Sequence, residues 1–546
     1  MIDTPAWHKL QQHHRETAHL TLRTRFASQP DRFDQLSLSA CGLLLDYSKN
    51  RLDTTTIGLL VDLARAQGVE ALRDAMFEGH PVNATEGRPA LHTALRAASS
   101  RGDPISLAVR GTLERMRLVS HTVRSGVWKG YDGRPIRAVV HLGIGGSHLG
   151  PRAVCAALAD RGRHPLDVRF VANVDAHELE AALHNLEPAT TLFIVASKTF
   201  TTAETMMNAH GARFWCETNG MPAAALPQHF IAVSANEREV AEFGLDPRQM
   251  LPMWDWVGGR FSLWSAIGLP IAMQCGMEAV YDLHAGARAM DHHFRTAPLA
   301  ANMPVLLALV GLWNIDMLGL STLSIAPYHH LLRHLPAHLQ QLEMESNGKS
   351  VRRDGSAVDC ATAPVIWGQA GTNGQHAYFQ WLHQGRADAA VDFIAVARPR
   401  HANDPHHRAL LANCLAQSEA LMEGRSAAEV DTAMAAEGMD AATRAALVPH
   451  KVFPGNRPSN TLLLPRLDAY TLGSLLALYE HKVVVQGALW GINSFDQWGV
   501  EWGKDIARRI EGHLDLERVT GGGDKAANGS TRGLIAAITR MRGGGH

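Results

Sequence analysis

Short apolar runs alternate with longer amphipathic stretches from about residue 105 onward, and this alternation limits the fold more than any other feature. Parallel strands that are covered on both faces have continuous hydrophobic sequences, and amphipathic stretches between them indicate βαβ units. The runs are AVVHLGI (138–144), DVRFVANV (167–174), TLFIVASK (191–198), HFIAVSA (229–235), GLSTLSIAPY (319–328), APVIWG (363–368), VDFIAVAR (391–398) and NTLLLPRL (460–467). The pattern predicts an α/β protein with two parallel sheets and a helical wrapping.

The runs divide the chain into four predicted parts. They are an N-terminal helical segment packing on the large domain, a small α/β domain, a large α/β domain, and a C-terminal helix with a glycine-rich tail: 1–104, 105–280, 281–504 and 505–546. The apolar stretch 303–328 approaches the length of a membrane span, but Asn314 and Asp316 lie in its middle. We therefore expect a buried helix followed by a buried strand there.

A glycine-rich loop follows the first predicted strand, in the segment VVHLGIGGSHLG (139–150). A strand, a glycine turn and a helix start aim backbone N–H groups at an anion. The dinucleotide motif G-x-G-x-x-G is not met, because His148 stands where its third glycine belongs, and the lysine and hydroxyl of a P-loop are also missing. The loop predicts an anion site for something other than a nucleotide.

A second loop of this kind carries hydroxyl side chains just past the strand TLFIVASK. Ser197, Lys198, Thr199 and Thr202 stand at this junction, and hydroxyls there can either cap the following helix or bind phosphate. Ligands of open parallel sheets lie beyond the carboxyl ends of the strands. We therefore expect both loops to converge on one small phosphate, with simple helix capping as the alternative.

Three further side chains are candidates for chemistry. Arg260 follows two glycines, in a place from which a guanidinium can be held against an anion, and a surface arginine is the alternative. Glu345 precedes an Asn-Gly pair, where a solvated glutamate beside a tight turn is the alternative. His376 follows a glycine-rich turn, but a chain with 30 histidines makes one histidine a weak signal.

The segment GINSFDQWGVEWGK predicts a helix that begins at a capping box of Ser494 and Gln497. On such a helix Gln497, Glu501 and Lys504 share one face. The neighbouring Trp498 and Trp502 favour a helix packed against the protein, and an exposed Glu–Lys pair is the alternative.

Composition excludes several classes of function. The formal net charge of -1 lacks the basic excess of a nucleic-acid-binding protein. Six scattered cysteines without a C-x-x-C pair, and a start without a signal peptide, predict reduced thiols in a cytoplasmic protein. Three histidines spaced four apart are rejected as metal ligands because Pro336 is expected to interrupt their helix and no carboxylate completes the set: His330, His334 and His338.

The content and order of these segments resemble the phosphoglucose isomerase family. GGRFSLWSAIGLP and GALWGINSFDQWGVEWGK are similar to its two signature segments, and its other blocks are similar to HLGIGGSHLGP, SKTFTT, MESNGK, GTNGQHAYFQWLHQG and FPGNRPSN. The match extends from about residue 90 to residue 504 and is loose in the tail, around STRGLI. The resemblance implies two sugar-isomerase (SIS) domains, each a parallel sheet flanked by helices, wrapped by helical N- and C-terminal extensions. It also implies a homodimer with the active site at the subunit interface.

The resemblance further implies an aldose–ketose isomerase of glycolysis and gluconeogenesis that interconverts D-glucose 6-phosphate and D-fructose 6-phosphate without cofactor or metal. Glu345 would move the proton between C2 and C1 through a cis-enediol(ate), Arg260 would stabilise its negative charge, and His376 and Lys504 would open the sugar ring. The residues implied to bind the substrate are Gly146, Ser147, Ser197, Lys198, Thr199, Thr202, Gln341 and Gln497.

Two alternatives remain open at this point. A phosphosugar-binding regulator with SIS domains would keep the hydroxyl loops and could lose Glu345, His376 or Lys504; this chain has all three and shows no basic helix-turn-helix segment. A broader isomerase would also accept mannose 6-phosphate, which depends on placement near Glu345 that a sequence does not reveal.

Overall fold

The computed structural model describes residues 1–98, 102–159, 166–514 and 528–543. The chain forms two compact units, Met1–Phe495 and Asp496–His546, which we describe separately. Within the described ranges, no helix is long and apolar enough to cross a bilayer. Most of the predicted glycine-rich tail, at 515–527 and 544–546, lies outside the described residues.

The smaller sheet of the first unit has five parallel strands in the order β4-β3-β5-β6-β7. They are β3 (Ala138–Leu142), β4 (Asp167–Val171), β5 (Thr191–Ala196), β6 (Phe230–Ser234) and β7 (Leu251–Pro252). The first four confirm the prediction, and β7 is too short to give a recognisable apolar run. Because β3 and β5 are neighbours, the two loops that follow them leave the same end of the sheet.

The larger sheet has six strands in the order β1-β2-β11-β10-β8-β9. They are β1 (Ser37–Ala40), β2 (Leu43–Asp46), β8 (Thr322–Pro327), β9 (Val365–Trp367), β10 (Ala390–Val396) and β11 (Ser459–Leu464). The last four are parallel and confirm the predicted runs, including the strand at the end of 303–328. The prediction was incomplete for the N-terminal part, because β1 and β2 form a hairpin that joins β11 in the antiparallel direction.

The hairpin was missed because its turn is made by an unusual pair of residues. Cys41 and Gly42 both have positive φ, 51° and 76°, which are the angles that a two-residue hairpin turn requires at its central positions. Asn-Gly or Asp-Gly would have marked such a turn, whereas Cys-Gly does not. The larger sheet is therefore mixed, with the N-terminal segment at its edge.

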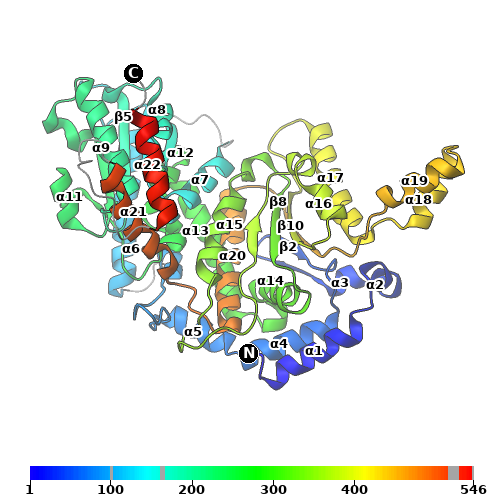
Figure 1. The fold of residues 1–546 in the computed structure, drawn as a ribbon. Helices are drawn as coiled ribbons and strands as arrows, with labels where there is room; N and C mark the ends of the chain where they lie inside the picture. The colour runs from blue at the N-terminus through cyan, green and yellow to red at the C-terminus, as the bar shows by residue number, and fades with distance from the viewer. Residues whose placement is uncertain (99–101, 160–165, 515–527, 544–546) are drawn as a thin grey trace. The chain divides into compact units, whose positions relative to one another are not determined.

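Helices cover both sheets (Figure 1). In the first unit they are α1 (Pro5–Thr17), α2 (Leu22–Ser28), α3 (Arg32–Gln35), α4 (Thr54–Ala66), α5 (Val69–Glu78), α6 (Pro104–Arg124), α7 (Gly146–Leu158), α8 (Ala176–Leu183), α9 (Ala203–Thr218), α10 (Leu226–His229), α11 (Glu237–Phe243), α12 (Leu269–Cys275), α13 (Met277–Thr296), α14 (Met303–Leu312), α15 (Leu335–Asn347), α16 (Phe379–Gln384), α17 (Asp404–Glu423), α18 (Ala427–Ala436), α19 (Ala441–Lys451) and α20 (Ala469–Trp490). The second unit contains α21 (Glu501–Leu514) and α22 (Gly529–Gly543). Figure 1 shows α18 and α19 as a pair that extends away from the two sheets.

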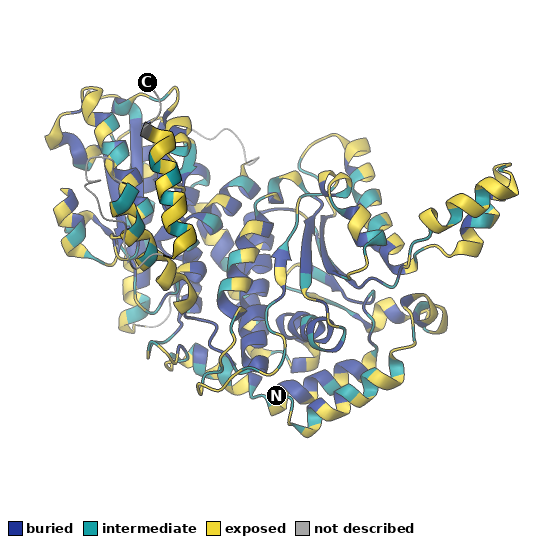
Figure 2. Cartoon of the chain, viewed as in Figure 1, coloured by how far each residue is buried: buried dark blue, intermediate teal, exposed yellow. Residues whose placement is uncertain are grey.

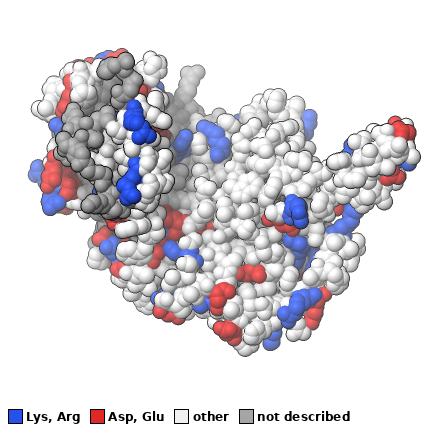
Figure 3. Space-filling view, in the orientation of Figure 1, with Lys and Arg blue, Asp and Glu red and all other residues white. Residues whose placement is uncertain are grey.

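One continuous hydrophobic core joins the two sheets. Leu192 and Ile194 of β5 belong to the same cluster as Ile325 of β8, whereas Phe193 and its neighbours on the other face of the small sheet form a separate cluster. The alternation follows from the twofold period of a strand. Figure 2 shows α14 and α20 as buried helices within this core, and Figure 3 shows charges of both signs mixed over the visible surface.

The helix α20 lies at the centre of the core and packs backbone to backbone on α13. A Cβ atom at Gly473 would lie 2.0 Å from the carbonyl oxygen of Leu283, and one at Gly286 would lie 1.8 Å from that of Tyr470. Except for Tyr470, every residue of α20 is buried. Glycine at these two positions is therefore what allows the two helices to approach so closely.

Asp316 of the apolar stretch 303–328 provides a test of this core. Trp490 Nε1 donates to Asp316 Oδ2 at 2.9 Å, and burial raises the pKa of the carboxyl to about 7. A raised pKa favours the folded state below the unfolded value near 4, and this contribution is lost as the pH rises to about 7. We therefore expect the difference in unfolding free energy between Asp316→Asn and wild type to shift in favour of the variant by about 2–3 kcal/mol when the pH is raised from 5 to 8.

Urea unfolding of both proteins at the two pH values measures this difference. Asp62→Asn, which removes an exposed carboxyl on α4, is the matched control. Its difference in unfolding free energy from wild type should be the same at both pH values. A difference between Asp316→Asn and wild type that stays constant across this pH range would show that the carboxyl is ionised normally in the folded protein.

Candidate active site

The first loop of the site connects β3 to α7. Gly145 has a φ of 58°, and α7 begins directly after it at Gly146. The amide of Ser147 already donates to the carbonyl of Ile144 at 3.2 Å, and that of His148 donates to the carbonyl of Gly145 at 3.0 Å. A Cβ atom at Gly146 would lie 2.1 Å from the carbonyl oxygen of Gly259 and 2.6 Å from the amide of Arg260. Ser147 follows in the first turn, and its carbonyl lies 2.7 Å from the Nε2 atom of the buried His141. Glycine at 146 therefore lets this turn lie directly against the segment that carries Arg260.

The second loop connects β5 to α9. Thr202 is the N-cap residue of α9, but its side chain makes no capping hydrogen bond; its hydroxyl lies 3.0 Å from that of Ser197. The Ser197 hydroxyl also accepts from the amide of Phe200, and the hydroxyl of Thr201 donates to that of Thr199 at 2.9 Å. Simple helix capping, the alternative for this loop, therefore does not describe Thr202.

Lys198 belongs to the same loop, but its side chain turns toward another segment. Its Nζ donates to the carbonyl oxygens of Asp255 and Val257, at 3.3 Å each, and lies 3.4 Å from the Asp255 carboxylate. The side chain thus ties the loop to the segment just before Gly258 and Gly259. Only the backbone of Lys198 remains for an anion at the loop.

Arg260 is almost completely buried, which rules out the surface alternative. It lies in a 3₁₀ turn, η5 (Gly259–Trp264), and is 3% exposed. Its Nε donates to the hydroxyl of Ser346 at 2.6 Å, and its Nη2 donates to the carbonyl of Ser494 at 2.6 Å. Its Nη1 lies 3.8 Å from Oε2 of Glu345. The guanidinium is therefore held from two sides with one nitrogen directed at a carboxylate.

Glu345 and Gln341 lie on one face of α15. Gln341 Nε2 donates to Glu345 Oε2 at 2.8 Å, and it also lies 3.1 Å from the place of a Cβ on Gly145. The Glu345 side chain is 21% exposed, so it is partly buried but can still be reached by solvent or a ligand. The helix continues to Asn347, with Gly348 as its C-cap, so the Asn-Gly pair ends a helix and the expected tight turn is absent.

Gln341 thus connects the glycine loop to the carboxylate, and Arg260 completes the group. The structure brings together residues from β3–α7, η5 and α15, which are far apart in the sequence. Ser346 was missed by sequence reasoning, although its place beside Glu345 in MESNGK was a usable signal. A carboxylate next to a fixed cation can take and return a proton on a carbon atom next to a carbonyl group.

His376 lies apart from this group. It is exposed at the end of a 3₁₀ turn, η10 (Asn373–His376), which is held by the hydroxyl of Tyr328 donating to Gln375 Oε1 at 3.0 Å. Among the described residues, no hydrogen bond or ion pair joins His376 to Glu345 or Arg260. The predicted role of His376 therefore has no support from a contact with Glu345 or Arg260.

Two predicted residues belong to the second unit, where the predicted helix start was wrong. Gln497 precedes a 3₁₀ turn, η11 (Trp498–Val500), and α21 begins only at Glu501, because the Ser494 hydroxyl donates to Asn347 Oδ1 at 2.7 Å and caps no helix. Gln497 thus lies outside the helical face of Lys504. Lys504 Nζ donates to Glu501 Oε1 at 2.8 Å, the exposed pair that was the alternative. Trp498 and Trp502 are exposed, contrary to the prediction of a packed helix.

The expectation that Pro336 interrupts the helix of the three spaced histidines was wrong. Pro336 lies in the first turn of α15 and does not interrupt it, and His330 belongs to a separate turn. In the ranges that the structure describes, no group of three or more His, Cys, Asp or Glu side chains is arranged to hold a metal ion.

Comparisons with known proteins agree on one family. The family profile described as "Phosphoglucose isomerase" matches residues 46–535. A glucose-6-phosphate isomerase of Cupriavidus metallidurans is 52% identical over 98% of both chains, and glucose-6-phosphate isomerase 1 of Chromobacterium violaceum is 49% identical over 100% of both. The crystal structure of a glucose-6-phosphate isomerase from Chlamydia trachomatis superposes with a TM-score of 0.84 and 31% identity over 99% of both chains.

The contact between Gly146 and Gly259 provides a matched pair of variants. Gly146→Ala places a methyl group inside the backbone of Gly259, so we expect a loss of about 1–3 kcal/mol in unfolding free energy and weaker protection by inorganic phosphate. Gly259→Ala should cost less than about 1 kcal/mol, because a Cβ there meets nothing within 4 Å. Thermal unfolding with and without phosphate measures both effects, and equal behaviour of the two variants would contradict the assigned contact.

Proposed function

The chain belongs to the phosphoglucose isomerase family, and we propose from that premise which of its residues perform each step of the reaction. It is an aldose–ketose isomerase that interconverts D-glucose 6-phosphate and D-fructose 6-phosphate in glycolysis and gluconeogenesis. The alternative of a regulator without catalysis is therefore set aside. The observation that carries the assignment of roles is the Glu345 carboxylate held by Gln341 and facing the fixed guanidinium of Arg260.

The phosphate of the substrate binds at the two loops that leave the small sheet. Backbone N–H groups at Gly146 and at Lys198, together with hydroxyl groups, supply neutral donors for it. The hydroxyls are those of Ser147, Ser197, Thr199 and Thr202. The Ser197–Thr202 contact supports this assignment, because it places the two hydroxyls side by side while the Thr202 side chain makes no capping hydrogen bond to α9.

Glu345 transfers the proton between C2 and C1. A base is needed next to the carbonyl of the open-chain sugar, and the enediolate that forms carries negative charge. Arg260 stabilises that charge from a position fixed by Ser346 and by the carbonyl of Ser494, so little reorganisation accompanies the reaction. Gln341 orients the carboxylate and the sugar.

His376 and Lys504 open the ring, and Gln497 holds the sugar. We assign His376 to the active site of the partner subunit in a homodimer. It is exposed, and among the described residues it makes no hydrogen bond or ion pair with Glu345 of its own chain. The family resemblance supports the same arrangement. The enzyme acts in the cytoplasm, in keeping with six free cysteines.

The role of Glu345 is tested by Glu345→Gln. The amide keeps the shape and one hydrogen-bonding partner but is no base, so isomerisation should fall by about two to four orders of magnitude while substrate still binds. Exchange of the C2 hydrogen with deuterated solvent measures the step directly, with a chelator present throughout. Glu70→Gln, which changes an exposed carboxyl on α5, is the control. Exchange at the wild-type rate in Glu345→Gln would assign the base to another residue.

The shared site is tested by mixing two inactive variants, His376→Ala and Glu345→Gln. If the two residues come from different chains, each mixed dimer holds one intact site, and random mixing should restore about a quarter of wild-type activity. Two different affinity tags allow the mixed dimers to be purified and counted. Mixed dimers without activity would place both residues in the site of one chain.

A further inference from the structure

The helix α15 has two faces with different tasks. Gln341 and Glu345, four residues apart, face the active site, whereas Glu343 lies two residues from Glu345 and so roughly 200° around the helix. Glu343 is 3% exposed and Lys482 is 2% exposed, and Lys482 Nζ donates to Glu343 Oε2 at 2.6 Å. The face of α15 that points away from the substrate is thus joined to the central helix α20 by a buried ion pair.

A second contact holds α15 just beyond Glu345. Asn347 Nδ2 donates to the carbonyl of Val483 at 3.0 Å, and Asn347 Oδ1 accepts from the hydroxyl of Ser494. Glu345 therefore lies between two attachments to α20, one at residue 343 and one at residue 347. Lys482 and Val483 are neighbours on α20, so both contacts attach α15 to the same part of the core.

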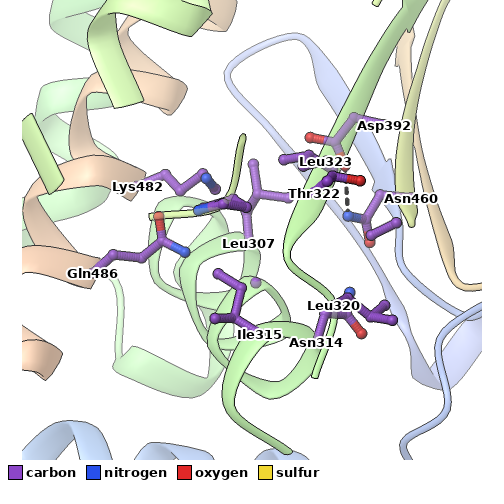
Figure 4. Close-up of a pocket in the computed structure, with 13 residues that line it drawn as sticks. Leu307, Asn314, Ile315, Leu320, Thr322, Leu323, Asp392, Asn460, Lys482 and Gln486 are labelled. Carbon is purple, nitrogen blue, oxygen red and sulfur yellow. Dashed lines mark hydrogen bonds between the residues drawn. The ribbon is translucent and has the colours of Figure 1, made fainter. Parts of the chain in front are cut away.

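The surroundings of Lys482 show why the ion pair sets its position. Lys482 and Gln486 point from α20 into a cavity that Asp392 and Asn460 face from the larger sheet (Figure 4). Asp392 is already bonded by Asn460 Nδ2 at 2.8 Å and by the hydroxyl of Tyr479 at 2.9 Å. Lys482 thus borders a cavity, while its ammonium binds the carboxylate of Glu343.

We propose that Lys482, through its ion pair with Glu343, is a positioning residue that sets the place of Glu345 against Arg260. The proposal rests on the proposed function, in which Glu345 is the base. A charge-assisted hydrogen bond is shorter and stronger than a neutral one, and it constrains the position of α15 in the direction of Lys482. Glu345 Oε2 lies 3.8 Å from Arg260 Nη1, and a small shift of α15 would change that distance directly.

The test replaces the pair by apolar side chains of similar size, in the double variant Glu343→Leu, Lys482→Met. Such a replacement removes both charges of the pair, and Asp392, which faces the same cavity, keeps its bonds from Asn460 and Tyr479, so the melting temperature should stay close to that of wild type. We expect kcat to fall by about 10- to 100-fold while KM for fructose 6-phosphate changes by less than about twofold, because the phosphate loops are untouched. Wild-type kcat in the folded double variant would overturn the proposal.

Two further variants complete the test. Glu343→Asp keeps the charge but shortens the side chain by one methylene, so it should fold and lose about 3- to 10-fold in kcat at unchanged KM. If the double variant does not fold, Glu343→Asp tests the positioning role instead. Wild-type kcat in Glu343→Asp would then overturn the proposal. Ser474→Ala is the matched control, since it removes a buried hydrogen bond that α20 makes to the carbonyl of Gly286 on α13 and that does not involve α15. Its melting temperature should fall while kcat stays within about twofold.

The outcome for Glu345→Gln separates this inference from the proposed function. If Glu345→Gln is inactive and the pair variants are normal, the positioning role is wrong and the base assignment stands. If Glu345→Gln retains activity, the base assignment is wrong and the positioning role fails with it.

Discussion

The buried helix α20 is the constraint on which the rest of the structure depends. Its backbone touches that of α13 at Gly286 and Gly473, and it carries ionisable side chains into a core that excludes water. Each such side chain needs a partner, because an unpaired charge in the interior is costly. The partners come from distant parts of the chain, so pairing them also fixes the positions of those parts.

The pairs around Glu480 show this most clearly. Arg96, which has no exposed side chain, donates to Glu480 at 2.6 Å and makes a bidentate pair with Asp291 of α13, at 2.7 and 2.8 Å. Burial opposes the charge of each group, yet Asp291 and Glu480 raise the pKa of Arg96, and Arg96 lowers the pKa of Asp291. Burial raises the pKa of Glu480, and Arg96 opposes that shift. Trp264 Nε1 donates to the other oxygen of Glu480 at 2.7 Å and anchors the turn that carries Arg260. The scaffold and the active site are thus joined through one buried glutamate.

The site is built from three segments that are held in place by α20 and by Ser494, which follows it in the chain. Arg260 reaches the carbonyl of Ser494 just after α20, and Ser346 on α15 holds its Nε. The glycine loop of the small sheet packs on the same turn through Gly146. A guanidinium placed in this way faces a carboxylate with its direction already set, which is the arrangement that lets a fixed charge stabilise a forming anion.

Local sequence determined the elements and much of the list of site residues. Apolar runs gave eight strands, because a strand buried on both faces needs such a run, and glycine and hydroxyl residues after two of them marked the two loops. It did not give the hairpin of β1 and β2, whose Cys-Gly turn has no clear sequence signature, or the true start of α21. Ser494 looked like a helix cap, but a long-range partner, Asn347, took its hydroxyl.

Only the tertiary structure decided which candidates are buried and what they face. Arg260 and Glu345 each have a surface residue as the plainer interpretation. Nothing in the sequence around Arg260 shows that Ser346 and Ser494, 86 and 234 positions away, bind its guanidinium. The buried pair of Glu343 and Lys482 joins residues that are 139 positions apart. Hydrophobic period and helix capping are local and can be derived from the sequence, whereas burial and charge pairing depend on contacts that exist only once the chain has folded.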